Sequence, residues 1–303
     1  MRSKVRSQFK HLSRLALVVL SVYICWRMFR GTNWEQLGAA LSHLSVGTLA
    51  SSTLWYLLSR FFQGLRFHAL FPCGFPFPIH LGLNMASQAA NIALPGRAGE
   101  LLRPFYLKKW RPRLSIKTLA AGILIDKYVE AAMFLPMVAW VVFLNTGDRA
   151  LIDNQEKFSP WIVAAAVAVP LVGSIVSHLK PFKNFFEHSG GSKVSTASLW
   201  SALSWLCFYL SVNALVKDSS LALAVTVAVN MAGAISGIPG GLGAYEAAYV
   251  FVVTKSGAVK EVALAQALAS HTLQLVVVLV SGAFVIWKWG WPKSSAKSAL
   301  AKL

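Results

Sequence analysis

Long apolar stretches separated by short polar segments dominate the hydropathy pattern of the chain. A helix needs about 20 predominantly apolar residues to cross the hydrocarbon core of a bilayer, which is about 30 Å thick. Six stretches reach this length, and they cover residues 12–28, 46–70, 116–144, 161–179, 199–216 and 261–287. No polar segment between them is long enough for a soluble domain. The pattern predicts an all-α integral membrane protein, with one membrane domain over residues 1–303 and six transmembrane helices.

Two further apolar regions are each interrupted by the sequence Pro-Gly-x-x-Gly. They cover residues 79–110 and 221–254, with the breaks from Pro95 to Gly99 and from Pro239 to Gly243. Proline lacks a backbone donor and glycine adopts conformations that other residues avoid, so this pair ends a helix. A helix end inside hydrocarbon is tolerated only where protein buries it or a polar cavity adjoins it. We therefore expect both breaks to line a binding site, as discontinuous helices do in transporters.

The two breaks belong to an internal repeat. A shift of 144 residues lays Pro95 on Pro239, and the flanking apolar stretches coincide under the same shift. This predicts repeats over residues 1–144 and 145–288. The repeats are parallel if each broken segment crosses the membrane, and inverted if each is a re-entrant hairpin.

The distribution of basic residues favours the hairpins. With a cytoplasmic N-terminus, the hairpin arrangement gives the cytoplasmic segments more than twice as many lysines and arginines as the outer segments. Cytoplasmic loops of membrane proteins carry such an excess. We predict two re-entrant hairpins that enter from opposite faces, in an inverted repeat with both chain termini in the cytoplasm. Eight kinked spans are the alternative.

Composition agrees with the membrane prediction and restricts the class of protein. The chain is 56% apolar and only 13% charged, which leaves too little polar surface for a soluble globule. Most of the net charge of +18 lies in loops and tails, where it sets topology and contacts anionic lipid rather than nucleic acid. The three cysteines lack metal-ligand spacing, and no P-loop sequence occurs. We expect no metal and no cofactor.

A phosphate site is the chemistry that the breaks favour. We expect a half-helix after each break, over residues 98–110 and 242–254, whose N-terminus offers free amide hydrogens and the positive end of a dipole to an anion. Arg97 and Arg103 flank the first break, and a guanidinium holds phosphate with forked donors. Alternatively, Glu100 pairs with one of these arginines and only holds the hairpin together. The other candidate substrate-binding residues are Asn91, Gly96, Gly99, Gly240, Gly241, Gly243 and Glu246.

A second polar group is predicted near the middle of the membrane. Asp126, Lys127 and Glu130 lie some ten residues into their apolar stretch, which is about 15 Å of helix. Their spacing of three and four residues places them on one helix face. The second repeat has His271 and Gln274 at the equivalent depth. These residues either couple transport to an ion or hold helices together.

The amino-acid sequences around the two breaks resemble those of a known family. The runs are Asn-Ile-Ala-Leu-Pro-Gly-Arg-Ala-Gly-Glu-Leu-Leu-Arg-Pro from Asn91 and Gly-Ile-Pro-Gly-Gly-Leu-Gly-Ala-Tyr-Glu from Gly237. They are similar to the flippase-like membrane domain of lysylphosphatidylglycerol synthetases, the multiple peptide resistance factor family, and to its stand-alone relatives. The resemblance covers nearly the whole chain. Members often carry Glu-Arg-x-x-Asp after the first break, where this chain has Asp-Lys-Tyr-Val-Glu from Asp126 to Glu130.

The resemblance implies translocation of a lipid across the cytoplasmic membrane of a prokaryote. No soluble synthase domain is expected in this chain, so the implied substrate is only a phosphate-bearing lipid, a phospholipid or polyprenyl phosphate. The leading hypothesis is a transporter rather than an enzyme, driven by a lipid gradient or a coupled ion. One alternative is a membrane-embedded enzyme that acts on lipid headgroups, with Glu100 or Glu246 as general base. Another is an accessory subunit of a lipid synthase or glycosyltransferase.

Overall fold

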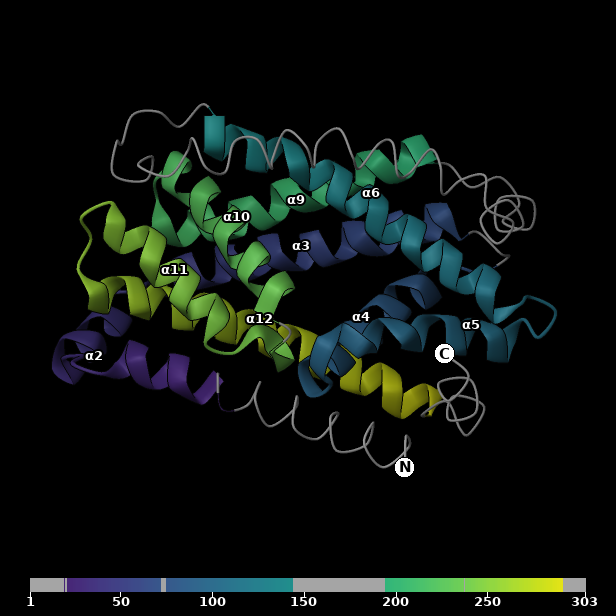
Figure 1. Ribbon diagram of the computed structural model, residues 1–303, viewed down its shortest axis with the longest axis horizontal. Coiled ribbons are helices and arrows are strands. Elements are labelled where there is room, and N and C mark those ends of the chain that lie inside the picture. Colours follow the sequence, from purple (N-terminus) through teal and green to yellow (C-terminus); the bar gives the residue numbers. More distant parts are fainter. Residues whose placement is uncertain (1–18, 20, 72–74, 144–193, 237, 291–303) are drawn as a thin grey trace, which may run out of the picture.

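Long helices form the body of the molecule (Figure 1). The computed structural model describes residues 19, 21–71, 75–143, 194–236 and 238–290, and every element in this part of the chain is helical. Four long helices follow the longest axis, and a shorter one lies at one end. These are α3 (Val46–Leu70), α6 (Ile116–Phe143), α9 (Val194–Val216), α12 (Lys260–Trp289) and the short α2 (Trp34–Ser42). The predicted span at 161–179 lies outside the described residues, and so do residues 12–18 and 20 of the span at 12–28.

The two broken segments form helical hairpins (Figure 1). The first hairpin consists of α4 (Phe77–Ala93), the 3-10 helix η1 (Pro95–Leu101) and α5 (Leu102–Trp110). The second consists of α10 (Ser219–Ser236), the 3-10 helix η3 (Pro239–Gly241) and α11 (Ala244–Lys255). The hairpins open toward opposite ends of the molecule, and their turns meet near its middle. A Cβ added at Gly240 in the second turn would lie 3.3 Å from Cγ2 of Ile92 in the first hairpin.

Both half-helices begin later than the sequence analysis expects. The first break winds through η1, so α5 starts at Leu102 rather than at residue 98. Gly99 allows this tight path, because a Cβ there would collide with the carbonyl oxygen of Ser87. In the second break Gly240, Gly241 and Gly243 have φ angles of 63°, 70° and 84°. Glycine adopts such angles without steric cost, and α11 therefore starts at Ala244 rather than at residue 242.

Polar side chains turn inward along α3 and α9. The hydroxyl of Ser52 lies 3.2 Å from that of Ser211, and the hydroxyl of Ser59 lies 3.2 Å from that of Ser204. All four serines are buried. Because residue numbers rise on one helix as they fall on the other, α3 and α9 run antiparallel. Their contact face thus includes paired hydroxyls beside aromatic contacts, such as the stacked rings of Phe62 and Trp200.

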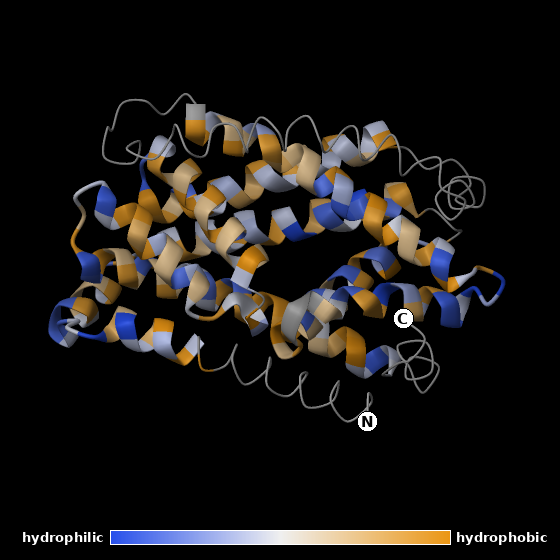
Figure 2. Cartoon of the chain, viewed as in Figure 1, coloured by the Kyte–Doolittle hydropathy of each residue, from blue (hydrophilic) through white to orange (hydrophobic). Residues whose placement is uncertain are grey.

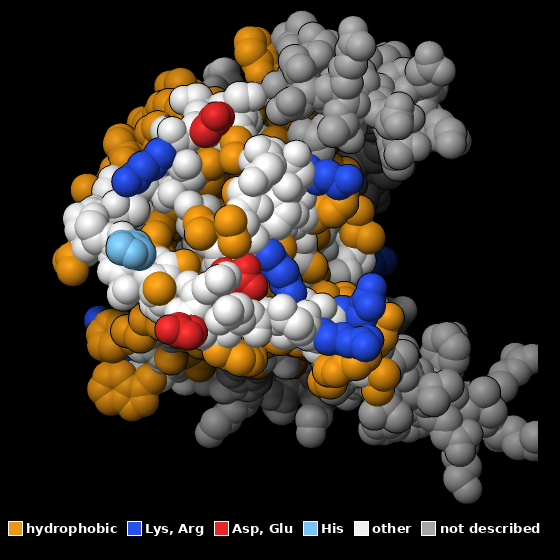
Figure 3. Space-filling model, turned by 90° about the vertical axis from the view of Figure 1, so that its left-hand side faces the viewer, with side chains coloured by type: hydrophobic (Ala, Val, Ile, Leu, Met, Phe, Trp, Pro, Cys, Tyr) orange, Lys and Arg blue, Asp and Glu red, His pale blue; other side chains and the backbone are white. Residues whose placement is uncertain are grey.

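Apolar side chains cover the outside of the molecule. Val46 is 83% exposed, and Ile235 and Trp287 are each 79% exposed. In Figure 2 hydrophobic segments follow the flanks, whereas hydrophilic ones gather at the two ends and inside. One end, seen face-on in Figure 3, carries scattered charged groups, and apolar side chains gather along its rim. A soluble monomer rarely exposes so much apolar surface.

Three described helices are long and apolar enough to cross a membrane, namely α9, α10 and α12. Two of them match predicted spans, but α10 is the first arm of the second hairpin. The predicted spans in α3 and α6 form helices of 25 and 28 residues that fall outside this group. Both carry inward-facing charged residues, which include Arg66 and Asp126. The division into repeats at residue 144 stays a prediction.

Candidate functional site

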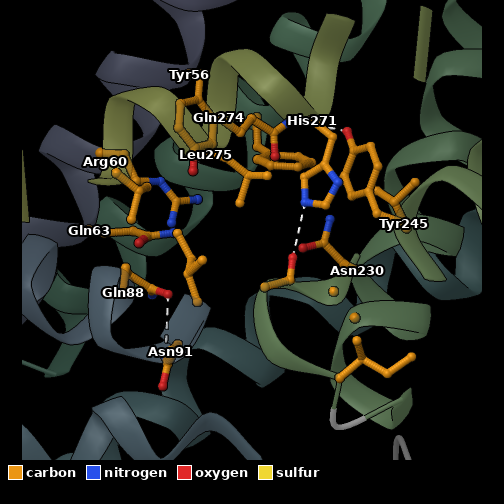
Figure 4. Close-up of a pocket in the computed structure, with 18 of the residues that line it drawn as sticks. Tyr56, Arg60, Gln63, Gln88, Asn91, Asn230, Tyr245, His271, Gln274 and Leu275 are labelled. Carbon is orange, nitrogen blue, oxygen red and sulfur yellow. Dashed lines mark hydrogen bonds between the residues drawn. The ribbon is translucent and has the colours of Figure 1, made fainter. Parts of the chain in front are cut away.

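A polar cavity of about 200 Å³ lies between the two hairpin turns and the long helices (Figure 4). Helices α3, α4, α6, α9, α10, α11 and α12 all contribute to its wall. Seven polar side chains, besides one glutamate and two tyrosines, line it: Arg60, Gln63, Gln88, Asn91, Asn230, His271 and Gln274. The labelled side chains of Figure 4 come from both sides of a shared space, and Arg60, Gln88 and His271 are among those that point into it. Such convergence of polar groups in a concave site is typical of ligand pockets.

The cavity lies far from either end of the long helices. Arg60 is 14 residues after the start of α3 and 10 residues before its end, so about 21 Å and 15 Å of helix separate it from the two ends. His271 is 11 residues into the 30-residue helix α12, which is about 17 Å. The cavity is therefore at the same level as the two breaks, as the sequence analysis expects for the breaks.

Arg60 is the cavity's free cation. Its guanidinium lies over the ring of Tyr56, 4.7 Å from the ring centroid. It has no ion pair and no hydrogen bond with any residue in the described part of the chain, and its Nε is buried. A guanidinium carries five N–H donors, and a buried donor without an acceptor is costly. Arg60 thus provides an anion-binding group that no described residue uses.

A closed ring of ion pairs adjoins the cavity. Three basic and three acidic side chains alternate in the order Arg66, Asp126, Arg103, Glu100, Lys127, Glu130 and back to Arg66. The six N···O distances run from 2.7 to 3.3 Å. Three members are at most 2% exposed, and Lys127 reaches 28%. The charge ring, as we call these six residues, has no net charge, and it ties α3, α6 and the first hairpin together.

The predicted residues of the first break lie in or beside the charge ring. Arg103 donates to Asp126 and to Asn84 at 2.9 and 2.7 Å, and lies 3.2 Å from Glu100. The pairing of Glu100 with Arg103, the alternative of the sequence analysis, is thus present. Asn91 donates to Glu100 at 3.3 Å and also lines the cavity. The side chain of Arg97 lies outside the described part, so its phosphate-binding role stays a prediction.

The second break is held by a different set of contacts. His271 Nδ1 lies 2.6 Å from Glu246 Oε1, and its Nε2 lies 3.1 Å from the carbonyl oxygen of Gly240. The ring of Tyr245 stacks on His271 with centroids 4.2 Å apart, and Gln274 donates to the hydroxyl of Tyr245. The predicted pair of His271 and Gln274 is thus brought next to the second break.

The expectation of free amide hydrogens at the half-helix starts is wrong at the second break. The N–H of Gly243 donates to Glu246 Oε2 at 2.8 Å, so the start of α11 is occupied by the chain's own carboxylate. At the other break, the N–H of Leu102 bonds to backbone carbonyl oxygens within η1. Because η1 runs into α5 without a gap, this helix has no open end there. The arginine of α3 is therefore a better anion site than either helix start.

A family comparison identifies the fold family. The family described as Lysylphosphatidylglycerol synthase TM region matches residues 14–282. The chain belongs to this family. The match includes both breaks, the charge ring and every residue that lines the cavity. No curated protein matches the chain.

Membership of the lysylphosphatidylglycerol synthase TM region family confirms two predictions. The suspected family is shown, and so is an all-helical membrane protein of lipid-related type. The exposed apolar side chains of the flanks therefore face lipid. A buried charge at mid-helix depth is then inside the membrane, where it marks a site of function unless it is paired.

Sequence reasoning missed Arg60 and Arg66, although a signal was present. Both interrupt the apolar stretch at 46–70, and the rule that singled out Arg103 applies to them equally. Gln63 lies three residues after Arg60, and Asn91 lies three after Gln88, so each pair shares a helix face. What the sequence lacks is any sign that Arg66 would be paired and Arg60 left free.

Proposed function

We propose that this protein translocates a phosphate-bearing lipid across the cytoplasmic membrane, with the phosphate held at Arg60. The unpaired guanidinium in a polar cavity is the observation that carries the proposal. A permanent charge at this depth costs several kcal/mol, and an anionic ligand offsets that cost. The membership of a lipid-related membrane family supports a lipid as the source of the anion.

The topology in this proposal is six spans and two re-entrant hairpins in an inverted repeat, with both termini cytoplasmic. The hairpins open toward opposite ends, which supports opposite entry faces (Figure 1). The shift of 144 residues pairs α3 with α9, and these helices run antiparallel, as an inverted repeat requires. Ser59 contacts Ser204, which is 145 residues away. The shift lays Ser59 on Leu203, the residue before Ser204. A residue that contacts the neighbour of its own counterpart lies close to the two-fold axis, so this contact supports an axis near the cavity.

Movement of one hairpin relative to the other would expose the cavity to each side in turn. The lipid headgroup occupies the cavity while the acyl or polyprenyl chains stay in the bilayer. The second turn, η3, packs against α4 and η1 of the first hairpin, with Gly240 next to Ile92 of α4, so this packing separates the two sides. A lipid gradient or a coupled ion supplies the driving force, and His271 with Glu246 is the titratable pair next to the cavity.

The carboxylates that the enzyme alternative requires are already engaged. Glu100 contacts Arg103 and Lys127. Glu246 holds His271 and caps α11. A general base needs a free acceptor within reach of the proton that it removes, so these contacts favour a transporter over an enzyme.

Reconstitution into liposomes tests the proposal. Labelled phospholipids and a labelled polyprenyl phosphate are placed in one leaflet, and the fraction that reaches the other leaflet is followed with a membrane-impermeant quencher. The wild-type protein should move at least one of them faster than protein-free liposomes do. Arg60→Gln should reduce the rate to background, and Arg60→Lys should retain part of it, because lysine keeps the charge but not the fork.

Arg30→Gln is the matched control. Arg30 stacks on Trp26 at the surface, outside the cavity, and its loss should leave the rate unchanged. The proposal is overturned if no phosphate-bearing lipid changes leaflet, or if Arg60→Gln works as well as wild type while keeping the wild-type melting temperature. If transport appears only after a lipid synthase or glycosyltransferase is added, the accessory-subunit alternative is favoured instead.

A further inference from the structure

Side-chain amides make up most of the polar wall of the cavity. Five of them line it: Gln63, Gln88, Asn91, Asn230 and Gln274. They come from α3, α4, α10 and α12, and in Figure 4 they surround the space that Arg60 enters. An amide has a carbonyl acceptor and two N–H donors. A hydroxyl group both donates and accepts, so a wall of amides matches a ligand that carries several hydroxyls.

The amides retain unused hydrogen-bonding capacity. Asn91 Oδ1 is buried without a partner in the described part of the chain, but it lies beside Gly99 of the first break and points away from the cavity (Figure 4). Asn230 donates to the carbonyl oxygen of Thr226 at 2.8 Å, and no described residue donates to its own Oδ1. Gln63 accepts from Asn84 at 3.3 Å. Polar atoms in a protein interior are normally satisfied, so the free Oδ1 of Asn230 in the cavity wall points to a polar ligand.

The charged side chains that line the cavity favour a ligand with one negative group and disfavour a ligand with a positive group. Arg60 offers one unpaired cation. The wall's carboxylate, Glu130, is 2.7 Å from Lys127 and 3.3 Å from Arg66, so it is already neutralised. A ligand ammonium would meet no unpaired carboxylate among the residues that line the cavity and would lie near an arginine, which is unfavourable in a low-dielectric site.

The aromatic side chains of the cavity do not form a cage for a cation. The face of Tyr56 is covered by Arg60, and the ring of Tyr245 stacks on His271. Trp205 packs against Phe134 with ring centroids 4.6 Å apart. Quaternary ammonium groups are recognised by open aromatic faces. A choline-type headgroup is therefore a poor match for this cavity.

The volume sets the size of the headgroup. A cavity of about 150 Å³ holds one benzene-sized molecule. The present cavity of about 200 Å³ is thus suited to a phosphate with a glycerol or one sugar-sized ring, and is too small for an oligosaccharide.

From these observations we infer that the cavity selects a lipid with a phosphodiester-linked, uncharged and hydroxyl-rich headgroup, of the size of one polyol or one sugar. The inference rests on the proposed function, since it names the class of lipid that the same site would take. Arg60 binds the phosphodiester anion, and the amides bind the hydroxyls. An aminoacylated headgroup is excluded by its positive charge.

A comparison of lipids with identical chains tests this inference in the liposome assay. Phosphatidylglycerol and phosphatidylinositol represent the proposed class. Phosphatidylethanolamine and aminoacylated phosphatidylglycerol carry an amine, and phosphatidic acid lacks the hydroxyl-rich part. The first two should move at least about tenfold faster than the other three, which corresponds to about 1.4 kcal/mol.

Amide variants connect the selectivity to the cavity. Asn230→Leu and Gln88→Leu should reduce the preference for phosphatidylinositol over phosphatidic acid. Asn213→Leu is the matched control, because this asparagine on α9 also has a buried oxygen without a described partner but is not part of the cavity wall. It should retain the full preference.

The outcomes separate this inference from the function on which it rests. Equal or faster movement of the aminoacylated lipid or of phosphatidic acid overturns the inference and leaves lipid transport intact. Full selectivity in Asn230→Leu and Gln88→Leu also overturns it. Absence of movement for every lipid overturns the proposed function itself.

Discussion

The two hairpins share the Pro-Gly-x-x-Gly signature but are held in different ways. The first is tied to α3 and α6 by the charge ring, whose partners are up to 64 residues apart in sequence, as Arg66 and Glu130 are. The second is held by a carboxylate three residues after the turn and by one histidine of α12. The same sequence motif thus occurs in two different settings. Buried ion pairs hold the first turn, and a capping carboxylate with one histidine holds the second. The first hairpin should be the rigid element, and the second should be the element that moves.

The largest expected effect concerns the rigid hairpin. Asp126→Asn removes a completely buried carboxylate that pairs with both Arg66 and Arg103. Removing one partner of a buried ion pair costs about 3–5 kcal/mol, since the remaining charge stays buried. The free energy of unfolding in detergent, measured by denaturant titration, should fall by about this amount. Glu35→Gln, at an exposed position, should change it little, and an equal loss in both variants would contradict a special role for the charge ring.

A smaller effect is expected at the second hairpin. His271→Leu removes the partner of both Glu246 and the Gly240 carbonyl oxygen. A buried group left unsatisfied costs about 1–3 kcal/mol. The same titration should show a loss below that of Asp126→Asn, while the transport rate falls more strongly than stability does. If the order of the two stability losses is reversed, the distinction between a rigid and a moving hairpin is wrong.

The turn of the second hairpin gives a finer test. Gly240→Ala places a side chain at a φ of 63° and close to Ile92. The left-handed conformation costs about 1–2 kcal/mol for a residue with a Cβ, and the contact hinders movement of the turn. We expect slower transport and a modest drop in melting temperature. Gly38→Ala should instead raise the melting temperature slightly, because Gly38 is helical and has open space around it.

The smallest expected effect concerns the contact between α3 and α9. Ser59→Ala removes the hydroxyl that lies 3.2 Å from that of Ser204. One hydrogen bond contributes about 0.5–1.5 kcal/mol net. The stability loss should lie in this range and should be the same with or without Asp126→Asn in a double-mutant cycle, because Ser59 belongs to neither hairpin. A strong coupling between the two changes would show that the charge ring depends on the α3 and α9 contact.

The breaks and the family could be predicted from the sequence because their signals are local. Proline and glycine end helices wherever they occur, so Pro95 and Pro239 marked both turns correctly. The family resemblance rests on short runs around the same residues. The cluster of Asp126, Lys127 and Glu130 was also visible, since helical spacing alone brings Lys127 to Glu130.

The partners of these residues could not be predicted from spacing. Arg66 reaches Asp126 only because α3 packs against α6 across 60 residues of sequence. The same packing leaves Arg60, six residues earlier on α3, in the cavity wall without an acidic partner among the described residues. In the sequence both arginines are simply charges within an apolar stretch. In the folded protein Arg66 has acidic partners, whereas Arg60 has none in the described part of the chain. The half-helix starts were placed too early for a similar reason, because the length of a 3-10 turn depends on the neighbouring α4.

The alternation of charges in the ring limits how its residues can change over evolutionary time. A single change of sign gives one member two neighbours of like charge inside the membrane, and a single neutral substitution leaves a charge unmatched. Exchanges of aspartate with glutamate, or of arginine with lysine, leave the alternation intact. The segment from Asp126 to Glu130 is an example. The similar family often has the motif Glu-Arg-x-x-Asp here, and each of the three charged residues in this chain differs from that motif but has the same sign of charge. In this segment of the ring the sign of each charge is thus kept while the length of each side chain changes.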